Sequence, residues 1–344
     1  MVRSDFALGR LGGARSRLLA EAGLAELLAG ADLADRVDRL RASVWAEAGA
    51  PAPSGRTPDL EAVEAALAAA FRAETLRVLR DLSGADGRLL RAFLLLQDAA
   101  SLKGPLRALA RGLTPEEASG LVEPSAGFGR DALLALSACS GAAAVADRLA
   151  AWGSPFAPAV AAHAAEFLKP GGLPRVEVAL DRVAFGTVLA AARGRGEDRA
   201  VLRLLAGARA DLANATILLA LGGTEEALDL HVPGGERIGA DRFRRLAALS
   251  GASLVTALAG ALSDLLGRSE ISAPLLGNPM VADHLMGRAL ARAARAAARR
   301  SPLSLAVPCA YALDLVEELR RVRLLLRGTE LGLPPATLVD LLEA

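Results

Sequence analysis

The segment "RRVRLLLRGTELGLPPATLVDLLEA" (residues 320–344) joins an arginine-rich amphipathic run, a glycine, paired prolines and a short second amphipathic run. A weaker copy of this order, "LRALARGLTPEEASGLV", occupies residues 106–122. In both copies proline stops one helix and starts the next, because proline lacks the N–H group and fits a first helical turn. The pair indicates repeated units. Apolar residues recur at spacings of three and four over most of the chain while alternating Val/Ile/Thr runs are nearly absent, which predicts an all-α fold.

Further repeats give the length of the unit. Asp38-Arg39-Leu40 returns as Asp147-Arg148-Leu149, and Ser140-Gly141 returns as Ser250-Gly251, at offsets of 109 and 110. The runs "LLLQDAASLKGPL", "LLAGARADLANATILLALGG" and "LDLVEELRRVRLLLRG" align on Asp98, Asp211 and Glu318, at offsets of 113 and 107. Each of these residues is followed three positions later by another polar residue, at Ser101, Asn214 and Arg321.

These offsets predict three similar helical units, residues 1–122, 123–235 and 236–344. A period of about 110 residues is too long for the common helical solenoids. Three copies suit closure around a pseudo-threefold axis, as a funnel with a central hole. A linear array of the three units is the alternative.

Composition restricts the class of protein. The chain has 344 residues, 53% hydrophobic side chains and a net charge of +1, so it can bury a large core but carries no overall field that would attract nucleic acid or an anionic membrane. An electrostatic partner would have to meet a local patch. The longest apolar stretch, residues 132–146, is shorter than the ~20 residues that span a bilayer. It predicts a buried core helix, and a chain without a transmembrane segment. Cys139 and Cys309 are expected to be small buried side chains in a reducing compartment.

Several local elements can be placed from sequence. Residues 175–180, "RVEVAL", are the best strand candidate, although they lie in a helical context. Residues 49–58, 168–174 and 231–239 are predicted loops, and a helix is predicted to begin near Pro279.

The last helices carry further signals. Ser301-Pro302 are predicted to cap a helix that Pro308 kinks or delays. Arg327-Gly328 are predicted to end that long helix, with Gly328 as the candidate for a left-handed residue, and Leu333-Pro334 to begin a short one.

No catalytic motif is present in the sequence. His163, His231 and His284 lack the spacing of metal ligands, no glycine-rich phosphate loop follows a strand, and no GxSxG elbow occurs. We therefore expect no cofactor, no metal and no catalytic residue, and neither a small-molecule substrate nor nucleic acid as a partner.

The repeated polar positions allow three interpretations. Asp98, Asp211 and Glu318 could stabilise the fold, line a socket for a partner, or act as acids and bases. Duplicated residues usually serve the fold, and polar side chains spaced by three share a helix face from which they can bond a neighbouring helix or loop. We therefore favour a structural role for these three residues and for Ser101, Asn214 and Arg321.

One predicted helix has a strongly charged face. Arg288, Arg292, Arg295 and Arg299 project from one side of "HLMGRALARAARAAARR", and Leu290, Ala293, Ala294 and Ala297 occupy the other. This arginine strip is either an ordinary solvated face or a site that docks acidic protein loops or lipid head groups.

The C-terminal segment "SPLSLAVPCAYALDLVEELRRVRLLLRGTELGLPPATLVDLL" resembles the C subunit of the V/A-type rotary ATPases, called the d subunit in eukaryotic vacuolar enzymes. The matching positions are Pro302-Leu303, Ala310-Tyr311, Glu318, Arg321, Arg323, Arg327-Gly328 and Gly332-Leu333-Pro334. Residues 6–45 are similar to the family's opening, and "DLANATILLALGG" is similar to its Asp-x-x-Asn helix. Ser101 stands where this family usually has asparagine.

The resemblance implies a non-catalytic, funnel-shaped protein of three helical domains, peripheral to the cytoplasmic side of the membrane. Its partners would be the central shaft subunits and the membrane proteolipid ring, and it would couple them mechanically during ion transport. The main rival is a helical protein-binding scaffold without a rotary role, and an all-α enzyme is the third hypothesis. Neither the coupling ion, H⁺ or Na⁺, nor the direction of operation follows from the sequence.

Overall fold

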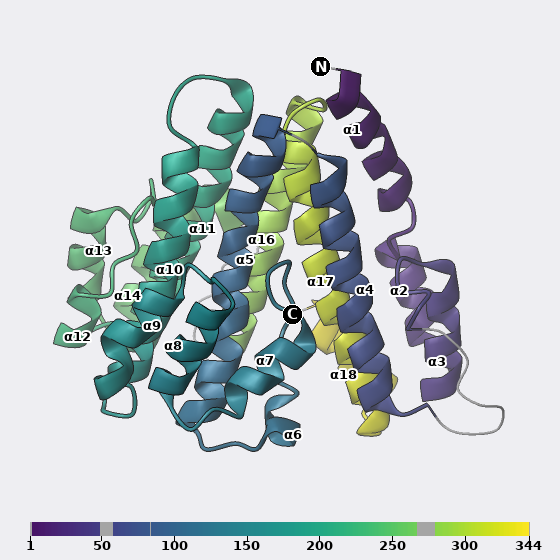
Figure 1. Ribbon diagram of the computed structural model, residues 1–344, viewed down its shortest axis with the longest axis horizontal. Helices are drawn as coiled ribbons and strands as arrows, with labels where there is room; N and C mark the ends of the chain where they lie inside the picture. The colour runs from purple at the N-terminus through teal and green to yellow at the C-terminus, as the bar shows by residue number, and fades with distance from the viewer. Residues whose placement is uncertain (1, 49–57, 83, 267–278, 344) are drawn as a thin grey trace.

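Three long helical hairpins form the body of the protein (Figure 1). The computed structural model describes residues 2–48, 58–82, 84–266 and 279–343, and these form helices, turns and loops with no strand among them. This confirms the predicted all-α class. The hairpins pair α4 (Leu60–Asp81) with α5 (Gly84–Ala110), α10 (Gly172–Ala191) with α11 (Glu197–Leu221), and α16 (Pro279–Arg300) with α17 (Ala306–Glu330).

The hairpins interlock in a cyclic order. The second helices α5, α11 and α17 all contact one another. Each first helix packs against its own partner and against the second helix of another hairpin: α10 against α5, α16 against α11, and α4 against α17. The last of these contacts joins the first and third hairpins.

Short helices follow or precede each hairpin. The short helices that contact a second helix include α7 (Arg130–Ser137) on α5, α13 (Ala240–Ala247) and α14 (Gly251–Leu266) on α11, and α1 (Val2–Arg15), α2 (Ala20–Leu28) and α3 (Leu33–Arg39) on α17. Helices α6 (Pro115–Ala118), α12 (Glu225–Leu228) and α18 (Pro335–Glu343) also contact α5, α11 and α17, respectively. The others are η1 (Leu40–Ala42), α8 (Ala142–Ala151), α9 (Ala157–His163) and η2 (Ala164–Glu166). The N-terminal helices therefore pack beside the C-terminal hairpin.

The core runs continuously through the hairpins. Leu90, Leu205 and Leu325, one on each second helix, have no exposed surface. Complete burial of a leucine side chain contributes about 1.5–3 kcal/mol. Polar side chains start several helices; Thr114, for example, forms a capping box with Glu117 at the start of α6.

The two turns that share the glycine–proline design have the same geometry. At the end of α5 the Leu113 N–H bonds the Ala108 carbonyl at 3.0 Å, and at the end of α17 the Leu333 N–H bonds the Gly328 carbonyl at 2.8 Å. Gly112 and Gly332 have φ values of +66° and +67°, so both turns are Schellman motifs with left-handed glycines. The helices α6 and α18 begin directly after them.

The predicted end of α17 was wrong by two residues. The helix continues to Glu330, and Gly332 rather than Gly328 is the left-handed residue. A Cβ atom at Gly328 would lie 2.2 Å from Leu338 Cδ2, so glycine at this position permits close packing of α18. The short helix begins at Pro335, one residue after the predicted start at Leu333-Pro334.

The start of α17 also differs from the prediction. The helix begins at Ala306, so Ser301 and Pro302 lie in the preceding turn. The carboxylate of Asp198, on α11, accepts the Leu305 N–H at 2.7 Å and fixes this start. Pro308 falls in the first turn, where its missing N–H costs no helical bond, so Pro308 delays the helix and does not kink it.

Two further predictions are corrected. Residues 175–180 belong to helix α10. This helix packs against α5, α9 and α11, so its apolar residues lie on more than one of its faces. In sequence, such a distribution resembles the alternation of a strand. Residues 132–146 form parts of two short helices, α7 and α8, separated by the turn around Ser140-Gly141. Each of these two helices buries only one face.

Other predictions hold or lie outside the described residues. Helix α16 begins at Pro279, as expected. Cys309 is buried, but Cys139 is only half-buried. The predicted loop at 49–58 and the segment before Pro279 fall almost entirely outside the described residues.

Helix α11 has the length and composition of a membrane span, and 56% of its apolar window is buried inside the protein. It also carries Arg209 and the buried side chains of Asp211 and Asn214. Its contacts with α5, α10, α16 and α17 are those of a core helix.

Candidate functional site

Asp98 and Asp211 hold the loops that lead into short helices. Asp98 Oδ1 accepts the Gly127 N–H at 2.9 Å, in the loop before α7. Asp211 Oδ1 accepts the Arg237 and Ile238 N–H groups at 3.0 and 2.7 Å, in the loop before α13. The carboxylates on α5 and α11 thus each bind the loop that precedes a short helix.

Close backbone approach makes these loop contacts possible. A Cβ atom at Gly127 would lie 2.6 Å from Asp98 Oδ2, and one at Gly235 would lie 2.3 Å from Asp211 Oδ1. A side chain at either position would push the carboxylate away from its N–H donors.

Glu318, on α17, binds the N-terminal part of the chain. Its two carboxylate oxygens accept the Leu19 N–H at 2.9 Å and the Trp45 indole N–H at 2.7 Å. Trp45 has no exposed surface, and Glu318 is 6% exposed. Glu318 therefore joins α17 to the chain on both sides of α2 and α3.

The three polar residues that follow these carboxylates differ from one another. The Asn214 amide donates to the Val232 carbonyl at 2.9 Å and accepts the Val232 N–H at 2.8 Å, and it is completely buried. Ser101 is also buried, but its hydroxyl has no hydrogen-bond partner among the described residues. Arg321 pairs with Glu21 at 3.0 Å near the surface.

The three carboxylates bond different parts of the chain. Burial raises the pKa of Asp98 and of Glu318 above their ordinary values, although N–H donors oppose this shift. An acid–base pair would need two such groups within reach of one reacting atom. Among the described residues, no hydrogen bond links any two of Asp98, Asp211 and Glu318, and each is committed to its own donors.

Three members of the arginine strip line a cavity beside the N-terminal helices. Arg288, Arg292 and Arg295 are half-buried and line a cavity of about 360 Å³ between α16, α17 and the N-terminal helices α1 and α2. Arg295 pairs with Asp314 at 2.7 Å. Only Arg299 is exposed to solvent. The opposite face of α16 behaves as predicted, with Leu290, Ala294 and Ala297 buried and Ala293 half-buried.

A larger cavity, of about 520 Å³, lies between the hairpins. Its walls come from α5, α10, α11, α16 and α17, mainly from the parts near the ends of α5 and α11 and the starts of α10 and α16. Apolar side chains such as Phe185, Leu212 and Leu290 line it together with charged ones. It therefore opens between the second helices rather than within one hairpin.

Ion pairs between elements border this cavity. Lys103 and Arg107, on α5, pair with Asp181 and Glu177, on α10, at 2.7 and 2.6 Å. Arg320, on α17, pairs with Glu123 at 3.1 Å. The cavity thus offers groups of both signs to a partner, and nearly all of them lie on rigid helices. Sequence reasoning missed these residues because they are single charges on separate helices, with no spacing that marks them as a group.

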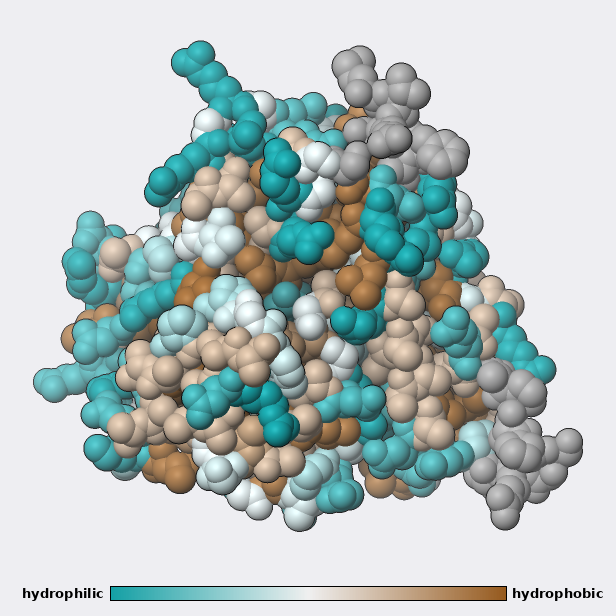
Figure 2. All heavy atoms as spheres, viewed as in Figure 1, coloured by the Kyte–Doolittle hydropathy of each residue, from teal (hydrophilic) through white to brown (hydrophobic). Residues whose placement is uncertain are grey.

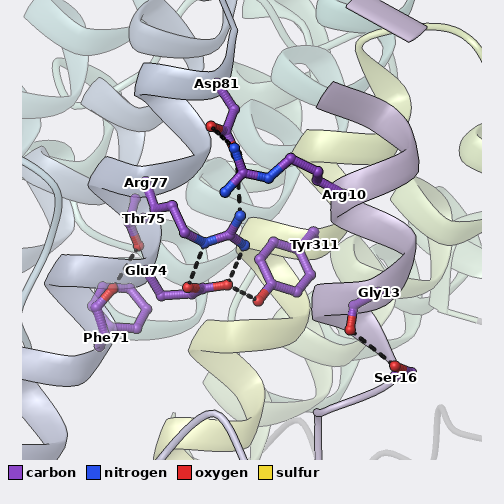
Figure 3. A network of polar contacts seen from close by, with 9 residues as sticks. All are labelled: Arg10, Gly13, Ser16, Phe71, Glu74, Thr75, Arg77, Asp81 and Tyr311. Carbon is purple, nitrogen blue, oxygen red and sulfur yellow. Dashed lines mark hydrogen bonds and ion pairs between the residues drawn. The ribbon is translucent and has the colours of Figure 1, made fainter. Parts of the chain in front are cut away.

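A polar network attaches the N-terminal helix to the hairpins (Figure 3). Glu74 on α4 accepts the Tyr311 hydroxyl and the Arg77 guanidinium, and Arg77 also contacts Asp81 at 3.1 Å. Arg10 on α1 reaches Asp81 at 3.0 Å. Burial alone would raise the pKa of Glu74, but these hydrogen bonds outweigh it and hold the pKa below its ordinary value.

The histidines are separate from one another. His231 packs edge-on against Phe243, with ring centroids 5.2 Å apart, and burial lowers its pKa. His163 ends α9, and the side chain of His284 lies outside the described part of the structure. The described residues contain no group of three or more potential metal ligands.

Three interlocked helical hairpins around a cavity lined by apolar and charged side chains define the class of this protein. Residues 7–340 match the model of the ATP synthase (C/AC39) subunit family, and the chain belongs to this family. The resemblance to the C subunit of the V/A-type ATPases is thereby confirmed. Among curated proteins, none matches the sequence.

Membership of the family places the protein in the stalk of a V/A-type ATPase complex. The family is a non-catalytic accessory subunit of that complex, with a peripheral location.

Proposed function

We propose that this protein is the adaptor of the central stalk, which couples the rotating shaft to the membrane rotor ring during ion transport. The central shaft subunits and the proteolipid ring are its proposed partners, and it lies on the cytoplasmic side of the membrane. It carries torque mechanically and performs no chemical step.

The observation that carries this proposal is the cavity between the hairpins. Three separate hairpins contribute to its walls, so a shaft tip seated there would press on all of them together. The bordering ion pairs could exchange partners with charged side chains of the shaft. The apolar wall would exclude water from the centre of such a contact.

Closure of the three units into a funnel is part of the same proposal. We retain the units 1–122, 123–235 and 236–344 and their pseudo-threefold arrangement. The cyclic packing of α10 on α5, α16 on α11 and α4 on α17 supports closure over a linear array. The bonds of Glu318 to Leu19 and Trp45 add a second link between the first and last units.

The repeated polar positions and the arginine strip receive different roles. We propose that Asp98, Ser101, Asp211, Asn214, Glu318 and Arg321 serve the fold. Within the strip, Arg288, Arg292 and Arg295 are engaged or enclosed beside Asp314, so Arg299 is the member best placed to reach a partner.

Filling the cavity tests the proposal. Ala213, on α11, lines the cavity, and Ala200 lies exposed near the start of the same helix. We expect Ala213→Trp to weaken binding of the purified shaft subunits at least tenfold, whereas Ala200→Trp leaves it unchanged, because misfit at the centre of an interface typically costs about 2 kcal/mol or more. Equal affinities of both variants would exclude the cavity as the socket. An unmodified chain that binds neither shaft nor ring would exclude the adaptor function.

A further inference from the structure

One end of the molecule carries a cluster of exposed arginines. The ends of α4, α10 and α16 and the starts of α5, α11 and α17 meet there, at the upper end in Figure 1. We define the hairpin-tip surface by six exposed residues at this end: Arg80, Arg88, Arg193, Arg195, Arg299 and Arg300. Figure 2 shows hydrophilic side chains projecting at the end where α10 leads into α11.

These six guanidinium groups are available for an external contact. In the part of the chain that the structure describes, none of them forms a salt bridge or a side-chain hydrogen bond. Nearby acidic groups are already engaged: Asp81 with Arg10 and Arg77, Glu197 with the Ser301 hydroxyl at 2.5 Å, and Asp198 with the Leu305 N–H. The protein as a whole has a net charge of only +1, so this positive charge is local to the hairpin tips.

An exposed apolar residue accompanies the arginines. Leu303, in the turn between α16 and α17, is 74% exposed, and the neighbouring Pro302 is exposed as well. An exposed leucine at the same end of the molecule as the six arginines matches the boundary of a bilayer, where head groups carry negative charge and acyl chains begin below them.

We propose that the hairpin-tip surface binds the anionic phospholipid head groups of the membrane. This rests on the proposed function only in placing the chain beside a membrane. The described residues that define the surface come from three separate turns, and the cavity proposed as the socket draws its walls from the opposite parts of the hairpins. Positive groups spread over three protruding tips fit a charged plane better than they fit one acidic protein loop, which would need a concave site.

The geometry also divides the two proposed contacts between the two ends of the protein. The socket lies towards the ends of α5 and α11, where Lys103 and Arg107 border it. The tips lie at the beginning of these helices. A chain with its tips on the membrane would therefore turn the socket away from the bilayer, towards the shaft.

Vesicle binding of the full-length chain tests the inference. The probes are vesicles of phosphatidylcholine mixed equally with phosphatidylglycerol, and vesicles of phosphatidylcholine alone, in cosedimentation at low salt. We expect the unmodified protein to bind the mixed vesicles and to be released by added salt. Each arginine near an anionic surface contributes about a fivefold gain in partitioning. The double variant Arg193→Gln/Arg195→Gln should therefore lose affinity for the mixed vesicles by a factor of up to about 25.

Two further variants keep the test specific. Arg111→Gln/Arg245→Gln removes the same charge from exposed positions away from the tips, and it should bind like the unmodified protein. Leu303→Ser retains every charge and should reduce partitioning by a smaller factor. Circular dichroism confirms the fold of each variant.

Several outcomes would overturn the inference. These are equal binding to neutral and anionic vesicles, equal losses in the tip variant and its control, or no vesicle binding while an acidic peptide binds at the tips. The last result would assign the surface to a protein partner. None of these outcomes affects the shaft-binding test, because that test uses the socket and contains no lipid.

Discussion

Replacing Glu318 by alanine should detach the N-terminal helices from α17. In the folded protein Glu318 is the shared acceptor for the Leu19 N–H and the Trp45 indole N–H. Alanine leaves both donors without this acceptor, and Trp45 is completely buried, so water cannot replace the lost bond without opening the contact. The effect should therefore concentrate in residues 19–45.

The size of the effect follows from two opposing contributions. A hydrogen bond to a charged acceptor contributes about 1.5–3 kcal/mol, and two are lost. Burial raises the pKa of Glu318, which shows that its charged form is held at a cost, and removal of the carboxylate recovers part of that cost. We expect a net loss of about 2–4 kcal/mol, which for a chain of this length lowers the Tm by about 3–6 °C.

Trp45 provides the assay. The second tryptophan, Trp152, is 44% exposed, so a Trp152→Phe background leaves Trp45 as the only indole reporter. Glu318→Ala should shift the Trp45 emission to the red and speed proteolysis around Arg15 and Arg17, while the helical content by circular dichroism stays close to that of the parent.

Glu330→Ala is the matched control, because it removes the same side chain from an exposed position on the same helix. It should change neither the emission nor the Tm. If Glu318→Ala also retained the blue-shifted Trp45 emission and melted within 1 °C of its parent, where the estimate above is about 3–6 °C, the idea that Glu318 anchors the N-terminal segment would be wrong.

Two other predictions concern buried polar groups. Asn214→Ala should lower the free energy of unfolding by about 3 kcal/mol in chemical denaturation, whereas Ser101→Ala at the equivalent position should change it by less than about 1 kcal/mol, since the Ser101 hydroxyl lacks a partner among the described residues. Burial would raise the pKa of Glu64, but the Arg327 hydrogen bond and the Arg323 charge hold it below its ordinary 4.5. The stability that the charged Glu64 contributes is therefore fully present above pH 4.5 and is lost as the pH falls through the folded-state pKa. The difference in the free energy of unfolding between the parent and Glu64→Gln should accordingly shrink on acidification.

Local sequence patterns predicted the helical class and several boundaries because the forces involved are local. Glycine followed by proline marks the turns after α5 and α17, and Gly112 and Gly332 have nearly equal φ values. The error at Gly328 arose because glycine has two uses: Gly332 permits a left-handed backbone, whereas Gly328 makes room for Leu338. Sequence spacing does not distinguish these uses.

Long-range contacts explain what the sequence could not predict. The helical period placed Arg288, Arg292, Arg295 and Arg299 on one face, but nothing in that segment shows that three of them line a cavity beside α1 and α2. Similarly, the start of α17 depends on Asp198, which lies 107 residues away from its partner Leu305. The cavity depends on residues from three hairpins, and no local pattern connects them.

The distance between the socket and the hairpin tips has a mechanical consequence. Helix α5 has 27 residues, and at a rise of about 1.5 Å per residue it extends about 40 Å between the hairpin-tip end and the socket end. Torque applied at one end would tend to slide the hairpins past one another and open the contact between the first and third. That contact is the packing of α4 on α17, reinforced by Glu318 and by the Tyr311–Glu74–Arg77 network.

Glu318→Ala should therefore weaken coupling in an assembled complex more than it weakens binding of the shaft. Measuring the ratio of ion transport to ATP hydrolysis alongside shaft affinity separates the two effects. Equal losses in both quantities would contradict this mechanical role of the closure.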